Sequence, residues 1–312
     1  MTTPTRFSPL LRQMSARDIN EEHRSATALE LFFDLCFVVA VAQAGMALVH
    51  ALAQGHVAAG VVGYLTVFFG IWWSWMMFTW FASAYDTDDV PYRLLTFVQM
   101  TGVLIYAAGT TSAFERQDWT VAYVGYLFMR LAMTAQWLRA ARAEQGAARV
   151  TAYRFAAGML LCQAGWTGLL ITEHRAQQWL FLFMVIAELC VPVFASRPQR
   201  TAWHPRHIVE RFGLFTLIVL GETVAAATLA VKSAAESNAS IRDILPIAVG
   251  GLLIVFAAWW IYFAVPGHTY LTSNRAGFLW GYGHYVIFAT AAAIGAGLEV
   301  AVEQATGHAS IS

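Results

Sequence analysis

The sequence has little charge, and lysine is almost absent from it. Of its 312 residues only 12% are Asp, Glu, Lys or Arg, and Lys232 is the single lysine. With 58% hydrophobic residues, the composition excludes an ordinary soluble globular domain. The formal net charge is zero, so the charge balance does not favour a nucleic acid as a partner, and we expect none.

Cysteine is also scarce. Cys36, Cys162 and Cys190 lie in apolar runs at unrelated spacings. This excludes a disulfide framework and a cysteine metal site, and it favours buried, inert thiols. The sequence also lacks glycine loops that bind phosphate, nucleophile elbows and Glu-x-x-His metal motifs. No short motif therefore assigns a reaction to the chain.

Long apolar runs dominate the rest of the sequence, and nine of them have the length of about 20 residues that a membrane-spanning helix requires. We predict an all-α integral membrane protein, a polytopic bundle of about nine transmembrane helices. Residues 1–27 form an N-terminal segment, 28–301 the transmembrane domain and 302–312 a short tail. No cleavable signal peptide is evident, so the first run is expected to be an uncleaved signal anchor. The runs cover residues 28–52, 57–83, 93–113, 119–139, 151–172, 178–196, 207–231, 244–265 and 277–301.

Basic residues are distributed unequally between the two sides of these runs. If the N-terminus is cytoplasmic, thirteen arginines fall in the inside segments, and three arginines with Lys232 fall outside. Cytoplasmic loops carry the excess of basic residues in membrane proteins. We therefore expect a cytoplasmic N-terminus and, with nine spans, a C-terminus on the other side. The lipid bilayer is the first expected partner.

The leading segment allows two interpretations. The stretch Arg6–Arg17, with Leu10, Leu11 and Met14, could form a short amphipathic helix on the membrane surface. It could equally be a disordered tail.

A weak internal repeat relates the first runs to the later ones. Glu30 aligns with Glu210 at an offset of 180 residues, and Trp72–Trp73 recurs as Trp259–Trp260 at an offset of 187. If the repeat is real, both copies have the same orientation and the chain is an incomplete six-plus-six parallel repeat. Chance similarity between aromatic-rich helices is the alternative.

The seventh run has a polar face. His207, Glu210, Arg211 and Glu222 fall within an arc of roughly 120° when the run is drawn as a helix. A charge inside a membrane-spanning helix is costly, so it normally faces other protein or a water-filled cavity. We therefore expect this face to have polar partners on other helices.

The first run offers such partners. Glu30 and Asp34 lie one helical turn apart, at the same predicted depth as His207, Glu210 and Arg211. We expect these side chains to meet in one cluster on the cytoplasmic side. The cluster could be a functional site, a structural ion-pair network that locks two helices together, or a transition-metal site built from Glu30, His207 and Glu210.

A second group of charged side chains is predicted near the middle of the membrane. Arg130 lies in the fourth run and Glu188 in the sixth, and Glu222 lies far along the seventh. An isolated arginine at this depth is poorly tolerated, so we expect Arg130 to pair with Glu188 or Glu222. His284 in the ninth run could relay protons or be a hydrogen-bonded structural histidine.

The loop after the second run is rich in carboxylates. Asp86, Asp88 and Asp89 occur within four residues, followed by Arg93. Carboxylate oxygens at such spacing could hold Mg²⁺, which would be the cofactor of an enzyme. A helix cap with solvated charges is the alternative.

Two longer motifs resemble the low-temperature-requirement A (LtrA) family of bacterial membrane proteins. They are Leu29-Glu-Leu-Phe-Phe-Asp-Leu-Cys-Phe-Val38 and His207-x-x-Glu-Arg-Phe-Gly-Leu-Phe-Thr-x-x-x-Leu-Gly-Glu222. The chain departs from the family pattern at Cys36, where valine is common, and at Ala264, where an acidic residue is frequent. It is also expected to stop before the last spans of longer members. The resemblance implies a location in the bacterial inner membrane and no established reaction. Supporting matches are the loop from Asp86 to Arg93, Trp259-Trp-Ile-Tyr-Phe263 and Gly283-His284.

Two functions remain open, with an unknown small molecule or lipid as the substrate. In a secondary transporter or permease, Glu222, Glu188 and Arg130 would couple transport to protons. The cluster near Glu30 would then be a cytoplasmic gate. In a membrane-embedded enzyme acting on a lipid or isoprenoid, Asp34 or Glu210 would be the acid, and the aromatic band of the second run would stabilise a cation. A structural or sensing protein is a third alternative.

Overall fold

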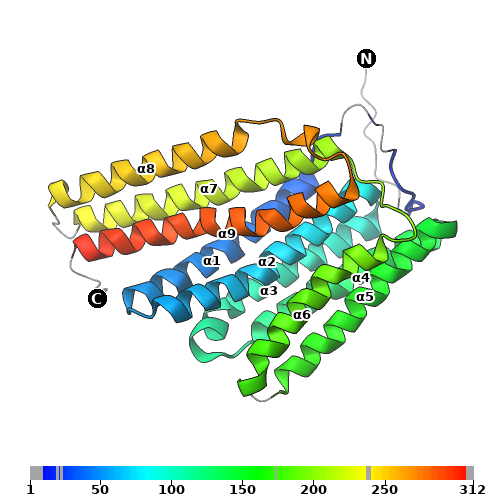
Figure 1. The fold of residues 1–312 in the computed structure, drawn as a ribbon, viewed down its shortest axis with the longest axis horizontal. Helices are drawn as coiled ribbons and strands as arrows, with labels where there is room; N and C mark the ends of the chain where they lie inside the picture. Colours follow the sequence, from blue (N-terminus) through cyan, green and yellow to red (C-terminus); the bar gives the residue numbers. More distant parts are fainter. Residues whose placement is uncertain (1–9, 19–20, 22–23, 173, 237–239, 307–312) are drawn as a thin grey trace.

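The computed structural model describes residues 10–18, 21, 24–172, 174–236 and 240–306. Within these ranges the chain forms nine α-helices and one short 3₁₀ helix, η1 (Gly267–Thr269), and no strand (Figure 1). Each α-helix coincides with one predicted run, and their ends differ by a few residues. The predicted all-α fold is therefore confirmed. The helices are α1 (Ala28–Ala53), α2 (Val57–Tyr85), α3 (Val90–Arg116), α4 (Thr120–Ala143), α5 (Gly146–Leu170), α6 (His174–Ala195), α7 (Pro205–Glu236), α8 (Ile241–Phe263) and α9 (Asn274–Ala305).

Six of the described helices are long and apolar enough to cross a membrane: α1, α2, α3, α7, α8 and α9. The other three are less apolar. Arginines within α4 and α5 lower their hydropathy, and in α6 the apolar stretch covers only Trp179–Ala195. The chain is a multi-pass membrane protein, in which α4 to α6 are the most polar of the nine predicted spans.

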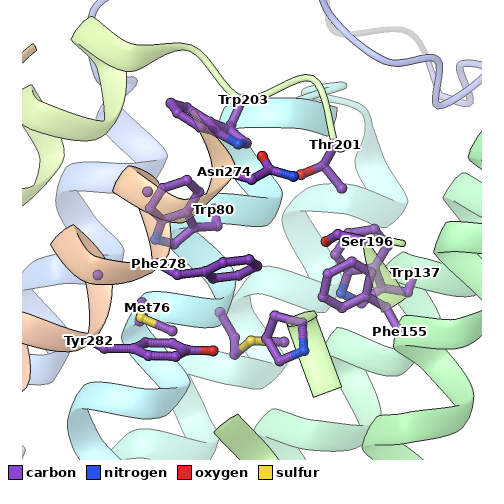
Figure 2. Close-up of a pocket in the computed structure, with 14 residues that line it drawn as sticks. Met76, Trp80, Trp137, Phe155, Ser196, Thr201, Trp203, Asn274, Phe278 and Tyr282 are labelled. Carbon is purple, nitrogen blue, oxygen red and sulfur yellow. The ribbon is translucent and has the colours of Figure 1, made fainter. Parts of the chain in front are cut away.

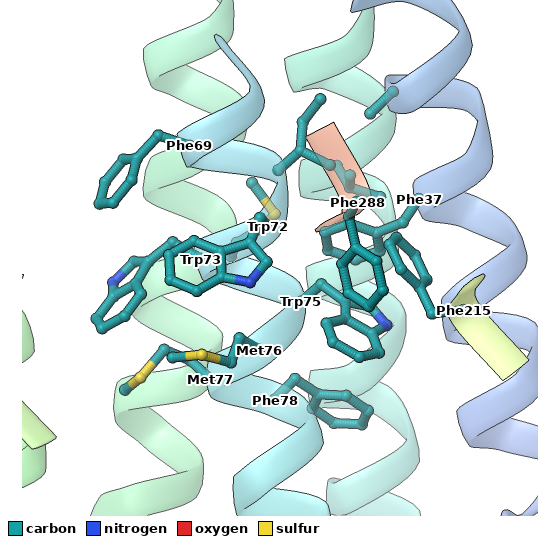
Figure 3. Close-up of a cluster of buried hydrophobic side chains, with 14 of the residues drawn as sticks. Phe37, Phe69, Trp72, Trp73, Trp75, Met76, Met77, Phe78, Phe215 and Phe288 are labelled. Carbon is teal, nitrogen blue, oxygen red and sulfur yellow. The ribbon is translucent and has the colours of Figure 1, made fainter. Parts of the chain in front are cut away.

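The helices form three neighbouring groups, with α1 to α3 between α7 to α9 on one side and α4 to α6 on the other (Figure 1). α2 is the central helix, because it contacts α1, α3, α4, α7 and α9. Its aromatic side chains are buried on all sides, as expected for a helix that is hydrophobic all round. The aromatic band predicted in this run therefore packs the interior (Figure 3). Its most buried rings are Phe68, Trp72, Trp73, Trp75, Phe78 and Phe81.

The packing order of α1 to α3 recurs in α7 to α9. α1 contacts both α2 and α3, and α7 contacts both α8 and α9. The aligned tryptophans nevertheless lie in different environments. Trp72 and Trp73 are buried, whereas Trp259 and Trp260 on α8 are 46% and 72% exposed. The parallel repeat stays a prediction. The order of helix contacts favours it, whereas the different burial of the aligned tryptophans does not.

Glycines bring α3 and α4 into close contact. A Cβ atom on Gly125 would collide with the backbone of Tyr106, and one on Gly109 would collide with the backbone of Ala122. Small residues allow such approach of two membrane helices. Because α4 also carries Arg130, this contact fixes the lateral position of that arginine.

The described part of the N-terminal segment crosses one end of the bundle. Residues 10–18 are not helical, and Met14 is buried in the core. The backbone N–H of Arg12 donates to Asp89 Oδ2 at 2.9 Å, and that of Arg17 donates to the Ala84 carbonyl at 2.9 Å. For these residues both earlier interpretations, a surface helix and a free tail, are wrong, because the backbone is not helical and tertiary contacts hold it against the bundle. Residues 6–9 and 307–312 lie outside the described part.

Candidate functional site

The site begins with the first turn of α1. Thr27 caps this helix, since its hydroxyl accepts from the Glu30 N–H at 3.2 Å and Glu30 Oε2 accepts from the Thr27 N–H at 2.7 Å. This reciprocal capping box fixes the Glu30 carboxylate at the start of the helix. Glu30 is fully buried, so its second oxygen must find a partner within the protein.

Four charged or titratable side chains of α1 and α7 meet there, and we call them the ion cluster: Glu30, Asp34, His207 and Arg211. Arg211 Nη1 lies 3.5 Å from Glu30 Oε1, and its Nη2 donates to Asp34 Oδ1 at 2.6 Å. His207 Nε2 lies 3.1 Å from Glu30 Oε1. All four are fully buried. The predicted meeting of the first and seventh runs is thus found in the structure.

The remaining predicted member, Glu210, lies at the edge of the ion cluster. It is half-buried, and its Oε1 accepts from the backbone N–H of Ala26 at 3.2 Å. Glu210 therefore holds the chain just before α1. The metal site proposed for Glu30, His207 and Glu210 is not supported, because no group of three His, Cys, Asp or Glu side chains in the described residues could hold a metal ion.

Arg24 and Asp86 extend the ion cluster to the membrane edge. Arg24 Nη2 lies 3.8 Å from Glu30 Oε1 and 3.7 Å from Asp86 Oδ2, and it donates to the Ala82 carbonyl at 2.7 Å. Burial raises the pKa of Asp86 to about 6, and the negative charge of Glu30 acts in the same direction, against Arg24. Arg17 Nη1 lies 3.5 Å from the same Asp86 oxygen, so three arginines, Arg17, Arg24 and Arg211, face the three carboxylates.

A second buried site surrounds Glu188 on α6. Its Oε2 accepts from Arg130 Nη2 at 2.7 Å and from Trp73 Nε1 at 2.9 Å. Its Oε1 accepts from the Tyr126 hydroxyl at 3.0 Å and from Trp166 Nε1 at 3.1 Å. The predicted pairing of Arg130 is therefore with Glu188. Four donors thus satisfy both oxygens of this buried carboxylate.

The three carboxylates of the predicted magnesium loop point to different partners. Asp88 forms two hydrogen bonds with Arg93, of 2.7 and 2.9 Å. Asp89 caps α3 and accepts from Arg139 at 2.7 Å. Asp86 turns inward to Arg24. The magnesium prediction is not supported, because the carboxylates diverge and no group of three His, Cys, Asp or Glu side chains in the described part of the chain could hold a metal ion. The Arg93 side chain is about half-exposed in its surface ion pair with Asp88.

Glu222 lies apart from Arg130 and Glu188, which corrects the prediction that these three form one group. It lines a cavity of about 350 Å³, including its mouth, between α1, α7 and α9. Glu299 on α9 lines the same cavity. Both carboxylates are half-buried, and no cationic side chain of the described residues pairs with either. Similar depth on different helices did not place Glu222 beside Arg130.

Aromatic rings fill the space between the ion cluster and this cavity. Trp75 stacks on Phe215 with ring centroids 4.4 Å apart, and Phe215 meets Phe288 at 4.9 Å (Figure 3). All three rings are fully buried. We call Trp75, Phe212, Phe215 and Phe288 the aromatic plug.

His284 packs against the edge of this plug. Its ring centroid lies 4.7 Å from that of Phe212. Its Nδ1 is 2.6 Å from the Trp280 carbonyl and its Nε2 is 2.9 Å from the Tyr262 hydroxyl. Because a carbonyl only accepts, Nδ1 carries the hydrogen and Nε2 accepts from Tyr262. Both nitrogens thus have partners, as in the structural alternative, and the proton relay stays a prediction.

Comparisons with known proteins identify the family. A family model described as "Bacterial low temperature requirement A protein (LtrA)" matches residues 25–312. The chain belongs to the LtrA family. This LtrA protein is also 30% identical over 255 residues to the uncharacterized protein RA0937 of Rhizobium meliloti (strain 1021). The match covers 79% of the chain, and it spans about 60% of the length of that relative. No solved structure matches the chain significantly.

Several residues of the LtrA site were missed by sequence reasoning. Glu299 is an acidic residue within a predicted run, so the rule that selected Glu222 could have found it. Arg24 stands just before the first run and could have been chosen as a neighbour of Glu30. Trp73 and Trp75 carried no signal, because an apolar run does not show which indole N–H meets a carboxylate.

Proposed function

We propose that this LtrA protein is a proton-coupled secondary transporter of the inner membrane, with its N-terminus in the cytoplasm. In this mechanism Glu222 and Glu299 take up and release the proton. The supporting observation is the cavity that both carboxylates line. Glu30, Asp34 and Glu188 are paired with arginines. A membrane carboxyl without a counter-ion can instead change its charge by exchanging a proton with a cavity.

The ion cluster acts as the cytoplasmic gate of this carrier. Arg211 and Glu222 are eleven residues apart on α7, which places them on the same helix face about three turns apart. The aromatic plug lies between them. A change of charge at Glu222 therefore acts on α7, the helix whose Arg211 binds Asp34 and Glu30. Rocking of α7 against α1 would open the gate.

The enzyme alternative has less support. Its proposed acids, Asp34 and Glu210, line neither the Glu222 cavity nor the cavity around Trp80 and Trp137. Asp34 is instead occupied by Arg211 and by Trp75. The aspartate loop does not converge on a metal position either.

A proton-flux assay tests the carrier proposal. The full chain is reconstituted in liposomes that contain the pH indicator pyranine, and a solute panel of sugars, amino acids and organic acids is added on one side. We expect at least one solute to drive a proton flux that Glu222→Gln and Glu299→Gln abolish. Glu236→Gln is the matched control, because Glu236 lies exposed near the end of α7.

Two results would contradict the proposal. One is a solute-driven flux that survives both substitutions, which would move the coupling site elsewhere. The other is the absence of proton flux for the whole panel while the protein converts a supplied lipid to a product, which would favour the enzyme.

A further inference from the structure

A second cavity lies at the end of the bundle that residues 10–18 cross (Figure 2). Its space measures about 560 Å³, including the part that opens outward. The walls come from α2, α4, α5, α6 and α9 and from the connection between α6 and α7. Its aromatic lining consists of Trp80, Trp137, Phe155, Trp203, Phe278 and Tyr282.

Two of the helices that line this cavity, α6 and α9, do not pack directly against each other. Among the described residues, α6 and α9 have no pair of Cα atoms within 8 Å. The Tyr282 hydroxyl bridges the gap by donating to the Leu189 carbonyl at 2.7 Å. Gly277 and Gly281 present bare backbone of α9 to the cavity. Side chains alone fill the space between the two helices there.

One buried donor in the wall has no partner. Trp137 is 3% exposed, and its Nε1 makes no hydrogen bond with any described residue. Its ring is held flat against Phe155, with centroids 4.1 Å apart. An indole N–H can only donate, and a buried donor without an acceptor is costly. The wall therefore favours a ligand that brings an acceptor oxygen into an apolar space.

The edge of the cavity is positively charged. The Arg200 guanidinium lies 3.9 Å from the centre of the Trp203 ring, and Trp203 lines the cavity. Arg197 follows Ser196, another lining residue, and stacks at 5.5 Å on the ring of Phe194. No carboxylate of the described residues forms an ion pair with either arginine. An anion is the matching partner for this edge.

We propose that this cavity binds an anionic phospholipid, with one acyl chain among the aromatic rings, an ester carbonyl at Trp137 Nε1 and the phosphate at Arg200 and Arg197. A water-soluble amphiphilic anion would share this chemistry. The lining favours the lipid, because its aromatic and apolar side chains match an acyl chain. The inference does not depend on the proposed transport of protons, since it concerns neither Glu222 nor the ion cluster.

Native mass spectrometry of the purified full chain tests this site. The protein is supplied with equimolar phosphatidylglycerol and phosphatidylcholine, and separately with 2-naphthalenesulfonate as a soluble amphiphilic anion. We expect preferential retention of phosphatidylglycerol. Arg200→Gln should weaken it about tenfold and Trp137→Phe about fivefold, as expected for one charge-assisted and one neutral hydrogen bond. The controls Arg142→Gln and Trp119→Phe, in the last turn and at the N-cap of α4, should leave retention unchanged.

Equal retention of the two lipids would overturn the proposal, and so would binding of naphthalenesulfonate alone. Because substitutions in the wall can disturb folding, a second experiment uses the unmodified chain. Phosphatidylglycerol with a diazirine on its acyl chain is cross-linked by light, and the labelled peptides are mapped. Labels on the segments with Met76, Trp137 or Phe278 support the site, whereas labels confined to the outer surface of α8 contradict it.

Discussion

Trp73 and Trp75 lie two residues apart on α2 and donate their indole N–H groups to different buried carboxylates. Trp73 Nε1 lies 2.9 Å from Glu188 Oε2, and Trp75 Nε1 lies 2.7 Å from Asp34 Oδ1. Two residues correspond to about 200° of helix rotation, so the indoles leave opposite faces of α2 (Figure 3). This helix joins the ion cluster to the Glu188 site, and a rotation of α2 would break bonds in both.

Replacement of either tryptophan should destabilise the protein while its ring packing is largely kept. Trp73→Phe and Trp75→Phe each remove one hydrogen bond to a buried carboxylate. We expect each to lower the free energy of unfolding by about 1–2 kcal/mol, measured by thermal unfolding in detergent. Trp72→Phe is the control, because the buried Trp72 N–H has no hydrogen-bond partner among the described residues. Equal losses in all three variants would show that ring volume alone matters.

The Arg130–Glu188 pair should show strong energetic coupling. Arg130→Met leaves a buried carboxylate without its cation and should cost about 3–5 kcal/mol. The double variant with Glu188→Gln should lose much less than the sum of the single losses. The comparison pair is Arg93 and Asp88, which has a similar 2.7 Å contact but is about half-exposed. Its coupling should stay below about 1 kcal/mol, and additive losses in the buried pair would contradict the interpretation.

Asp86 should make stability depend on pH. The folded-state pKa of Asp86 is about 6, above the ordinary value of 3.8. Between these two pH values the folded protein therefore holds a proton on Asp86 that the unfolded chain has released. The contribution of Asp86 to the free energy of unfolding is therefore largest below about pH 4 and decreases as pH rises to about 6. Measured by thermal unfolding, the stability of wild type relative to Asp86→Asn should therefore be lower at pH 7 than at pH 4.5. A difference that is constant across this range would refute the assignment.

The aromatic plug should block proton movement between the ion cluster and the carboxylate cavity. Phe215→Ala removes the ring that joins Trp75 to Phe288, and we expect a substrate-independent proton leak in pyranine-loaded liposomes. It should also cost about 3–5 kcal/mol of stability, as other truncations of buried aromatic residues do. Phe81→Ala is the control, because Phe81 is equally buried and packs on Tyr85 and Trp137. A leak of the same size in both variants would point to general loosening of the bundle.

The helices and the ion cluster were predictable from the sequence for a common physical reason. A long apolar run in a membrane protein satisfies its backbone only as a helix, so the run lengths approximate the helix bounds. Burying Arg211 requires anions at the same depth, and Glu30 and Asp34 were the available ones. The motifs of the first and seventh runs enter the membrane from the same side. Their predicted depth was therefore sufficient to identify Glu30 and Asp34 as the partners of Arg211.

Lateral position was not predictable in the same way. Glu188 and Glu222 have similar predicted depths, yet only Glu188 reaches Arg130, since depth does not determine which helices are neighbours. In the aspartate loop, the sequence shows that Asp86, Asp88 and Asp89 are close along the chain. It does not show in which direction each side chain points. The cap of α3 and the arginines nearby determined where each carboxylate points.

The ion cluster joins segments that the ribosome produces at very different times. Glu30 and Asp34 enter the bilayer with the first helix, while their partners His207 and Arg211 follow 177 residues later. During synthesis Arg24 is the cation nearest to Glu30 along the chain. Nascent chains that end before α7 should consequently retain α1 beside the insertion machinery, and its release should coincide with the arrival of Arg211.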